Sequence, residues 1–412
     1  MHEPFKKSPI LLVVVMFLTC SGAFSQSREF VSSKGQELVT PEGEPLLLRG
    51  INLGNWLVPE GYMFKFDSAT SPRMIEEVLC QLVGADEARE FWRRYRDTYI
   101  TREDIRFIRS LGLNSIRVPF NWRLFIVEDR PDEWSGPGFD MLDRVVRWCS
   151  EEGLWIVLDM HCAPGGQTGD NIDDSWGHLF LFESPEAQER TVRLWRKIAE
   201  RYASERFVVG YDLLNEPIPH FYDQAKYNLL LEPLYKRIVG AIREVDTNHL
   251  VFLGGAQWDT NFRVFGPPFD SQVVYTFHKY WCDTTQEMIQ EYVDYRSKYN
   301  IPVWLGESGE NSNQWIDSFR RLLERNNIGW CFWPYKKMDA ATCMVTFRRP
   351  DHWDAIRRFA NSPRTSYASI RAERPDIAAV REALEQFLEF SQFRNCQSNP
   401  GYLKSLGIVS PR

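Results

Sequence analysis

Two glutamates lie at the ends of apolar segments, where a carboxylate is unexpected unless it has a structural or functional role. Glu216 ends the run 208–216 and is followed by Pro217, and Glu307 ends the run 301–307. Burying a carboxylate is costly, and proline cannot continue a central strand because it has no amide proton. We therefore expect each glutamate to be held at a strand end. Two carboxylates that flank one bond are what the hydrolysis of a glycoside requires, one as acid and one as nucleophile.

Further polar and aromatic residues fall where other apolar runs end. We expect Asn215 to hold a substrate hydroxyl, and His278 and Tyr280 to orient the two carboxylates and separate their pKa values. Arg117 would keep the attacking carboxylate ionised through a charge-assisted hydrogen bond. The other expected substrate-binding residues, whose aromatic members suit the faces of sugar rings, are Asn52, Trp56, Trp122, His161, Trp258, Trp281 and Trp333.

Each of these residues also has a structural reading when it is taken alone. Arg117 could form a structural ion pair, His161 could be a satisfied core histidine, and Trp258 and Trp281 could pack loops. The order of the residues favours one shared site, because each falls at a strand end in succession along the chain.

The elements that must position these residues alternate along the chain. Short apolar runs rich in β-branched residues are typical of strands buried on both faces. They cover residues 46–53, 115–120, 155–161, 208–216, 250–256, 273–278, 301–307 and 329–333. Helical patterns lie between them at 101–112, 137–152, 185–202, 227–245, 288–299 and 315–325. Eight strands that alternate with helices predict parallel βα units.

A single closed (β/α)8 TIM barrel is the architecture that eight such units favour. The alternative is an open doubly wound sheet, which usually carries a glycine-rich phosphate loop after its first strand. The segment Gly50-Ile-Asn-Leu-Gly-Asn lacks that spacing. In a barrel, the ends of the strands named above meet at one rim, which is where active sites lie.

Several segments extend this barrel within one catalytic domain over residues 26–412. We expect a hairpin over 30–45 that closes the barrel floor, with Glu42-Gly43 as a turn. An insertion with its own helical pattern covers 58–100. A long loop at the top of the barrel covers 334–359, and a C-terminal helix covers 374–393.

The N-terminal segment predicts a secreted or periplasmic protein. Lysines precede the apolar run 10–18, small residues follow, and Ser25 is the expected last residue of a signal peptide over 1–25. A membrane anchor is the alternative, although the run is short for a mature span. Lipoprotein anchoring through Cys20 is disfavoured because Thr19 is large for the position before an acylated cysteine.

Composition is that of an ordinary soluble domain. Of the 412 residues, 43% are hydrophobic, and the formal net charge is −7. We find no long basic run, which argues against nucleic acid as a partner. We expect a monomer that binds an oligosaccharide, a polysaccharide or another β-glycoside. Seven cysteines follow Cys20, and we expect mostly buried thiols, with one disulfide as the alternative in an oxidising compartment.

The motifs as a set resemble glycoside hydrolase family 5 of the cellulase superfamily over about residues 45–360. They are Arg117 in Ile-Arg-Val-Pro-Phe, His161 in Leu-Asp-Met-His-Cys-Ala-Pro-Gly-Gly-Gln, Asn215-Glu216-Pro217, His278 and Tyr280 in Phe-His-Lys-Tyr-Trp, Glu307 in Trp-Leu-Gly-Glu-Ser-Gly, and Trp333 in Phe-Trp-Pro-Tyr. The resemblance implies that Glu216 is the acid/base, that Glu307 is the nucleophile and that the mechanism is retaining. It calls for no cofactor and no metal.

Within that family, Arg49-Gly-Ile-Asn-Leu-Gly-Asn-Trp and His161-Cys-Ala-Pro-Gly-Gly-Gln are most similar to the exo-β-1,3-glucanase and β-glucosidase-like branch. The exoglucanase pattern has a second tryptophan in the stretch that matches Leu57-Val58-Pro59-Glu60, and this chain lacks it. The segments 58–100 and 334–359 are also its own, so the sugar and the linkage stay open.

The sequence also bears on three functions other than hydrolysis. A carbohydrate-binding barrel without activity is disfavoured because every residue that the chemistry needs is present. A metal-dependent hydrolase would want His-x-His after the first strand, where this chain has Asn52 and Asn55. Transglycosylation shares the glycosyl-enzyme with hydrolysis and differs only in whether a sugar or water attacks it.

Overall fold

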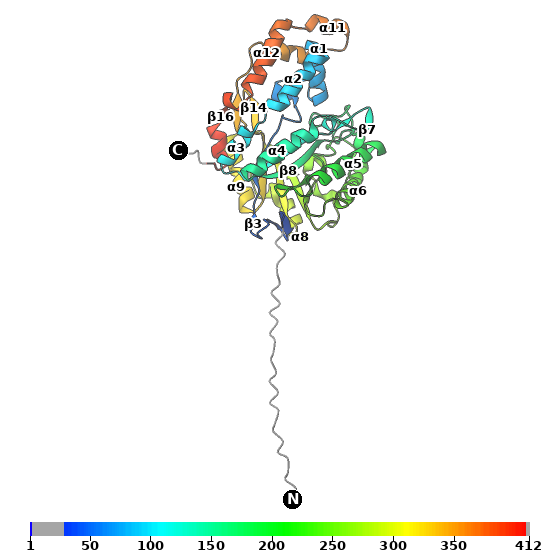
Figure 1. The fold of residues 1–412 in the computed structure, drawn as a ribbon, viewed down its shortest axis with the longest axis vertical. Helices are drawn as coiled ribbons and strands as arrows, with labels where there is room; N and C mark the ends of the chain where they lie inside the picture. Colours follow the sequence, from blue (N-terminus) through cyan, green and yellow to red (C-terminus); the bar gives the residue numbers. More distant parts are fainter. Residues whose placement is uncertain (2–28, 409–412) are drawn as a thin grey trace.

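The computed structural model describes Met1 and residues 29–408, so the predicted signal peptide lies, apart from Met1, outside the described residues. Eight parallel strands pair in chain order and close into a barrel, which confirms the predicted (β/α)8 fold (Figure 1). The barrel strands are β4 (Arg49–Asn52), β5 (Ser115–Asn121), β8 (Trp155–Cys162), β9 (Val208–Asp212), β10 (Leu250–Gly254), β11 (Val273–His278), β12 (Val303–Gly309) and β13 (Gly329–Trp333).

Helices cover the outside of the barrel between the strands. They are α3 (Arg102–Ser110), α4 (Gly138–Glu152), α5 (Pro185–Tyr202), α6 (Gln224–Arg243), α8 (Glu287–Tyr299) and α9 (Asn313–Arg325). Local sequence sets where they begin. Thr101 and Asp104 form a reciprocal capping box at the start of α3, and Ser184 and Ser312 accept backbone N–H bonds at the starts of α5 and α9. Such caps satisfy backbone donors that the first turn leaves free.

The barrel floor is closed by a small sheet, as predicted, but the sheet has three strands and not two. Strands β1 (Ser32–Lys34), β2 (Glu37–Val39) and β3 (Pro45–Leu46) pair antiparallel. Val31 and Leu38 join one apolar cluster with residues of the barrel strands, among them Leu250 and Phe252. Leu46 belongs to this sheet, so the first barrel strand is shorter than the predicted 46–53.

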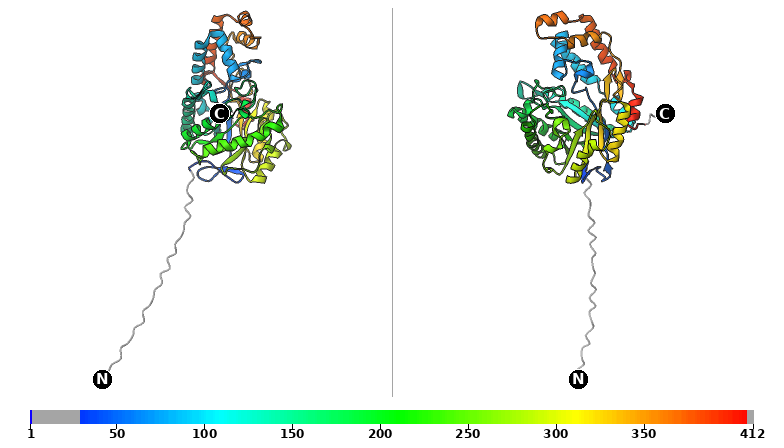
Figure 2. Two further views of the ribbon diagram at one scale, coloured as in Figure 1. Left: turned by 90° about the vertical axis from the view of Figure 1, so that its right-hand side faces the viewer. Right: turned by 180° about the vertical axis from the view of Figure 1, so that it is seen from behind.

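A helical lobe stands at the opposite end of the molecule from β3 (Figures 1 and 2). It joins two parts of the chain, the insertion after β4 and the segment after β13. The insertion supplies a 3-10 turn (Gly61–Phe64), α1 (Pro72–Val83) and α2 (Ala85–Thr98), and the later segment supplies α10 (Trp353–Asn361), α11 (Tyr367–Glu373) and α12 (Ile377–Phe390). Aromatic packing holds the two parts together, since the rings of Phe64 and Phe387 stack at 5.3 Å.

The segment 334–359 is therefore not an irregular loop, which corrects that prediction. It contains β14 (Lys336–Met338), β15 (Val345–Phe347) and most of α10, and β15 also pairs with β16 (Gln397–Ser398). The predicted helix over 374–393 is α12, which ends at Phe390. A final helix, α13 (Pro400–Ser405), packs against α9. A hairpin of β6 (Ile126–Val127) and β7 (Arg130–Trp134) was not predicted.

Two further properties bear on the predictions. The seven cysteines from Cys80 to Cys396 are free thiols, and four of them are buried. Among the described residues, no helix has the length and apolar character needed to cross a membrane.

Candidate active site

A pocket of about 640 Å³ opens at the carboxyl ends of the barrel strands. It brings together residues from the ends of seven of the eight strands or from the loops that follow them. Its predicted members are His161, Asn215, Glu216, Trp258, His278, Tyr280, Trp281, Glu307 and Trp333. This convergence follows from the topology, because parallel strands of a barrel all end on the same face.

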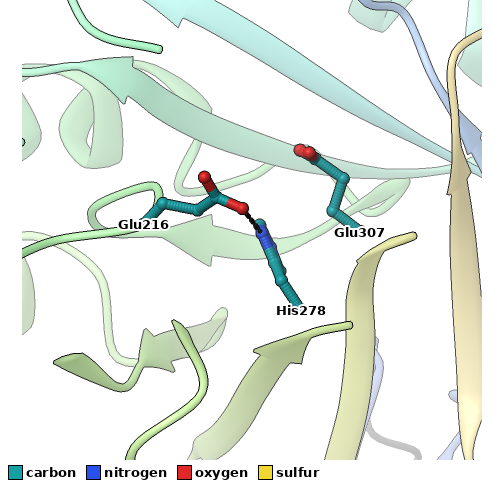
Figure 3. Close-up of side chains that lie close together, drawn as sticks. All are labelled: Glu216, His278 and Glu307. Atoms are coloured by element: carbon teal, nitrogen blue, oxygen red, sulfur yellow. Dashed lines mark hydrogen bonds and ion pairs between the residues drawn. The ribbon is translucent and has the colours of Figure 1, made fainter. Parts of the chain in front are cut away.

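Glu216 and Glu307 face each other across this pocket, as Figure 3 shows. Glu307 lies within β12, whereas β9 ends at Asp212 and Glu216 follows in a loop, not at the end of the predicted strand 208–216. The backbone of Glu216 is in the left-handed region, with φ 49°. One carboxylate oxygen from each glutamate and one ring nitrogen of His278 lie within 4.8 Å of one another. Both glutamates are at most 9% exposed.

Arg117 is fully buried beneath the pocket and organises the Glu307 side. Its guanidinium bonds to Oε2 of Glu307 at 2.9 Å, to Oδ2 of Asp212 at 2.8 Å and to Oδ1 of Asn215 at 2.9 Å. It also lies 3.1 Å from Oδ1 of Asp159. A buried cation among several carboxylates stays protonated. Arg117 therefore supplies a permanent positive charge to Glu307.

The two glutamates sit in different electrostatic environments. Burial and the charge of Glu307 raise the pKa of Glu216 well above its usual range. Burial also raises the pKa of Glu307, but Arg117 and a 2.8 Å hydrogen bond from the Tyr280 hydroxyl lower it. Glu307 is thus the carboxyl that ionises first, and Glu216 is the one that keeps a proton.

His161 and Trp333 form one wall of the pocket. Their rings stack at 5.5 Å with 5° between the planes. Nδ1 of His161 lies 2.8 Å from Oδ2 of Asp159, and burial lowers the pKa of His161 to about 3, so the imidazole is neutral. Gly54 is needed beneath Trp333, because a Cβ there would lie 2.6 Å from the indole ring.

A left-handed turn forms another part of the rim. Gln257, Trp258 and Asp259 all have φ between 51° and 58°, within the short helix α7 (Ala256–Asp259). Each such non-glycine residue costs about 1–2 kcal/mol. The turn directs Trp258 into the pocket and leaves Asp259 fully buried behind Glu216. Backbone strain of this kind is concentrated at functional sites.

Four predicted residues do not line the pocket. Trp56 is 1% exposed and donates its indole N–H to the carbonyl of Arg96, and Trp122 is equally buried, with a guanidinium over its ring. The expectation that these two indoles bind sugar is wrong, because the insertion 58–100 and neighbouring helices cover them. Asn52 lies below the pocket, where its Oδ1 accepts a bond from Arg117 at 3.1 Å. Asn52 and Arg117 thus hold other side chains from beneath and do not line the pocket themselves.

Six residues line the pocket without having been predicted: Glu60, Tyr62, Asn171, Ile172, Thr260 and Glu310. Glu60 is 4% exposed, its Oε1 has no hydrogen-bond partner, and burial raises the pKa of its carboxyl well above the usual range. Glu310 is paired with Lys337 at 2.7 Å. Glu310 had a signal in the sequence, because it lies three residues after Glu307. Glu60 had none, because it lies in the insertion.

The trio of Glu216, His278 and Glu307 has donor atoms spaced closely enough for a metal ion. The chemistry of the site opposes one. The Arg117 guanidinium is bonded to Glu307 at 2.9 Å, and a second positive charge at the same carboxylate would be repelled.

Comparison with known proteins finds a matching family model and several related chains. Residues 79–339 match the family model "Cellulase (glycosyl hydrolase family 5)". A "Beta-xylosidase" of Phanerodontia chrysosporium is 31% identical over 87% of this chain and 81% of its own length. A "Probable glucan 1,3-beta-glucosidase A" of Aspergillus fumigatus is 32% identical over 50% of this chain and 49% of its own length. A crystal structure of an endogalactoceramidase shares the fold, with a TM-score of 0.61 and 16% identity over 92% of this chain and 84% of its own.

Proposed function

The chain belongs to glycosyl hydrolase family 5, and from this premise we propose that it is a retaining β-glycosidase with Glu216 as acid/base and Glu307 as nucleophile. The observation that carries the proposal is the close approach of the two carboxylates, whose oxygens lie within 4.8 Å. Retaining enzymes hold their carboxyls about 5–5.5 Å apart, whereas inverting enzymes need about 6.5–9.5 Å to admit a water.

The division of roles follows from the surroundings of each carboxyl. Glu307, bonded to Arg117 and Tyr280, is the ionised group that attacks the anomeric carbon. Glu216 retains its proton and gives it to the oxygen of the departing group. After the glycosyl-enzyme forms, Glu216 takes a proton from water, which attacks the anomeric carbon and releases Glu307.

A β-linked glycoside is the proposed substrate class. The relatives named above, a beta-xylosidase and a glucan 1,3-beta-glucosidase, act on β-linked sugars by their names. Trp258, Trp281 and Trp333 line the pocket and offer apolar faces for the C–H faces of a pyranose. Asn215 lines the pocket, and its Oδ1 accepts from Arg117 at 2.9 Å, so its amide Nδ2, 3.5 Å from Nε2 of His161, is the group that would donate to the hydroxyl next to the anomeric centre.

The product anomer tests the mechanism directly. Protein beginning at residue 26 would be incubated with a panel of aryl β-glycosides and β-glucan oligosaccharides, with proton NMR at early times. We expect the β-anomer to form first, because two displacements restore the configuration. First formation of the α-anomer would contradict the retaining mechanism, and the panel member that is cleaved names the sugar.

Replacing Glu216 by Gln should make the rate depend on the leaving group. An aryl glycoside whose leaving group is an acidic phenol needs little protonation, so the rate of its glycosylation step should fall by less than about tenfold. A substrate with an alkyl or sugar leaving group should lose about 10²–10⁴-fold, the usual contribution of general acid catalysis. The measurement is kcat/KM against the pKa of the leaving group, for the variant and the wild type.

The pH profile gives a second reading of the same variant. Because the pKa of Glu216 is raised, the wild type should keep its acid form, and its activity, above the pH at which an ordinary glutamate ionises. Activity should then fall as pH rises through that pKa. The Glu216→Gln variant has no proton to lose and should lack this alkaline limb. Identical limbs in both proteins would assign the acid to another group.

Glu60 should bind a substrate hydroxyl as a neutral group. Because its pKa is raised and its Oε1 is unpartnered, Glu60→Gln keeps the shape and hydrogen bonding of the protonated acid and should stay within about threefold of wild-type kcat/KM. Glu60→Leu removes the hydrogen bond and should lower kcat/KM about tenfold. Equal values for the Leu variant and the wild type would show that Glu60 does not contact the sugar.

A further inference from the structure

Behind the acid/base lies a third buried carboxyl, Asp259, that the mechanism above does not use. Its Oδ2 accepts the backbone N–H of Glu216 at 3.1 Å and lies 3.4 Å from Nε2 of His278. The other nitrogen of the same imidazole, Nδ1, lies 2.8 Å from Oε1 of Glu216. The three side chains thus form a row in which His278 separates the two carboxyls.

No cation neutralises Asp259. Among the described residues, the one ionisable side chain of basic type paired with Asp259 is that of His278. The nearby Arg117 forms its ion pairs with Asp159, Asp212 and Glu307. Asp259 has no solvent exposure, and its Oδ1 has no hydrogen-bond partner. That oxygen would lie 1.9 Å from a Cβ at position 254, so only glycine fits there. An unpaired carboxyl in such a place favours its protonated form.

The state of His278 decides where the Glu216 proton can sit. The imidazole is neutral, because burial and Arg117 lower its pKa well below the usual range, so it carries one proton. If that proton is on Nε2, the lone pair of Nδ1 faces Glu216 and holds the Glu216 proton on Oε1, away from the substrate. If it is on Nδ1, the imidazole donates to Oε1, and the Glu216 proton sits on Oε2.

We propose that Asp259 is a positioning residue for the acid/base: its neutral carboxyl donates to Nε2 of His278 and so keeps the imidazole proton on Nδ1, facing Glu216. The Oδ2 hydroxyl can accept the N–H of Glu216 while donating to Nε2. Burial raises the pKa of Asp259 well above its usual range, in agreement with a neutral acid. No proton is gained or lost by the row, which only selects one tautomer.

The catalytic consequence rests on the proposed function. In the selected tautomer, Oε2 of Glu216 carries the proton that goes to the leaving group. Once that proton has been given up, the Nδ1–H of His278 remains as a donor to the new carboxylate. The strained turn over Gln257–Asp259 places the Asp259 carboxyl in this row, which gives the backbone strain a function.

Nitrogen-15 NMR of the imidazoles tests the tautomer without any substrate. The chain has seven histidines, so a protein labelled at histidine gives a simple spectrum. The His278 signals are assigned as those that disappear in His278→Gln. We expect wild-type His278 to be neutral with its proton on Nδ1. A proton on Nε2 would overturn the proposal, even if no variant of Asp259 folds. Because no turnover is involved, this outcome is separate from a failure of the proposed function.

Asp259→Asn tests whether Asp259 is what sets the tautomer of His278. Its amide must turn the carbonyl toward the Glu216 N–H, since two N–H groups would otherwise face each other. That carbonyl cannot donate to Nε2, so the His278 proton should move to Nε2, and kcat should fall at least tenfold with KM within about twofold. An unchanged tautomer would overturn the role of Asp259, and a changed tautomer with wild-type kcat would overturn its link to catalysis.

Asp246→Asn is the matched control. Asp246 is a buried aspartate whose Oδ2 lies 2.6 Å from Nδ1 of His249, ahead of β10 and thus at the floor end of the barrel. Its replacement perturbs a buried Asp–His pair in the same way and should change the His249 signals alone. A matching loss of kcat in this control would show that any disturbed Asp–His pair lowers activity.

Discussion

Replacing Glu307 by Gln should lower turnover of every cleaved glycoside by roughly 10⁴- to 10⁶-fold, the scale on which loss of a nucleophile acts. The amide is isosteric and can still accept a bond from Tyr280, so the fold should persist. It carries no charge for Arg117 to hold and cannot form the glycosyl-enzyme. The measurement is kcat on the aryl glycoside that the wild type cleaves best, beside the circular dichroism spectrum. Glu200→Gln, at an exposed site on α5, is the control and should match wild type.

Azide separates the roles of the two glutamates. In Glu307→Ala, azide can attack from the face that the carboxylate vacates, and one displacement gives an α-glycosyl azide. In Glu216→Ala, azide attacks the glycosyl-enzyme formed on Glu307 and gives a β-glycosyl azide. We expect these two products with an activated aryl β-glycoside. The opposite pair of anomers would exchange the roles of acid/base and nucleophile.

Replacing Arg117 by Met should cause the largest loss of stability. Arg117 is wholly buried and contacts three carboxylates, those of Asp159, Asp212 and Glu307. Removing one partner of a buried ion pair costs about 3–5 kcal/mol, because a charge is left without compensation. Urea unfolding of the variant should show this deficit. Arg93→Met, which breaks only exposed pairs on α2, should lose no more than about 1 kcal/mol.

The deficit of the Arg117 variant should also depend on pH. Burial raises the pKa of Asp159 and of Asp212 to about 7, although the charge of Arg117 lowers both values. Loss of Arg117 should therefore raise both pKa values further. A folded-state pKa above the unfolded value means that stability is present at low pH and is lost as pH rises through the folded pKa. The deficit at pH 8 should therefore exceed the deficit at pH 5. Equal deficits would show that packing, and not charge, is what Arg117 provides.

Much of the fold could be predicted because its signals are local. A strand buried on both faces must be apolar throughout, so the eight barrel strands appear as continuous runs. Helix caps such as Thr101 and Ser184 act within one turn, so they show where helices begin. Glu216 and Glu307 were visible for the converse reason, since a carboxylate at the end of an apolar run is out of place unless it has a function.

Side-chain direction beyond a strand end is not local, and there the predictions failed. Trp56 and Trp122 lie near the carboxyl ends of strands, as Trp333 does, yet they point into the covering layer and not into the pocket. Their direction depends on the insertion that packs over them. In the same way, β15 in the segment 334–359 pairs not only with β14 but also with β16, a partner some fifty residues later that the local sequence does not reveal.

The sequence by itself thus determined the barrel, the two facing glutamates and the order of residues around the rim, because apolar runs and parallel strands impose them. The tertiary structure alone decided which groups surround each glutamate. Glu60 reaches the pocket from an insertion, Asp259 reaches Glu216 through a left-handed turn, and Arg117 is surrounded by carboxylates from separate strands. Those contacts join residues distant in the chain, and the protonation of each glutamate depends on them.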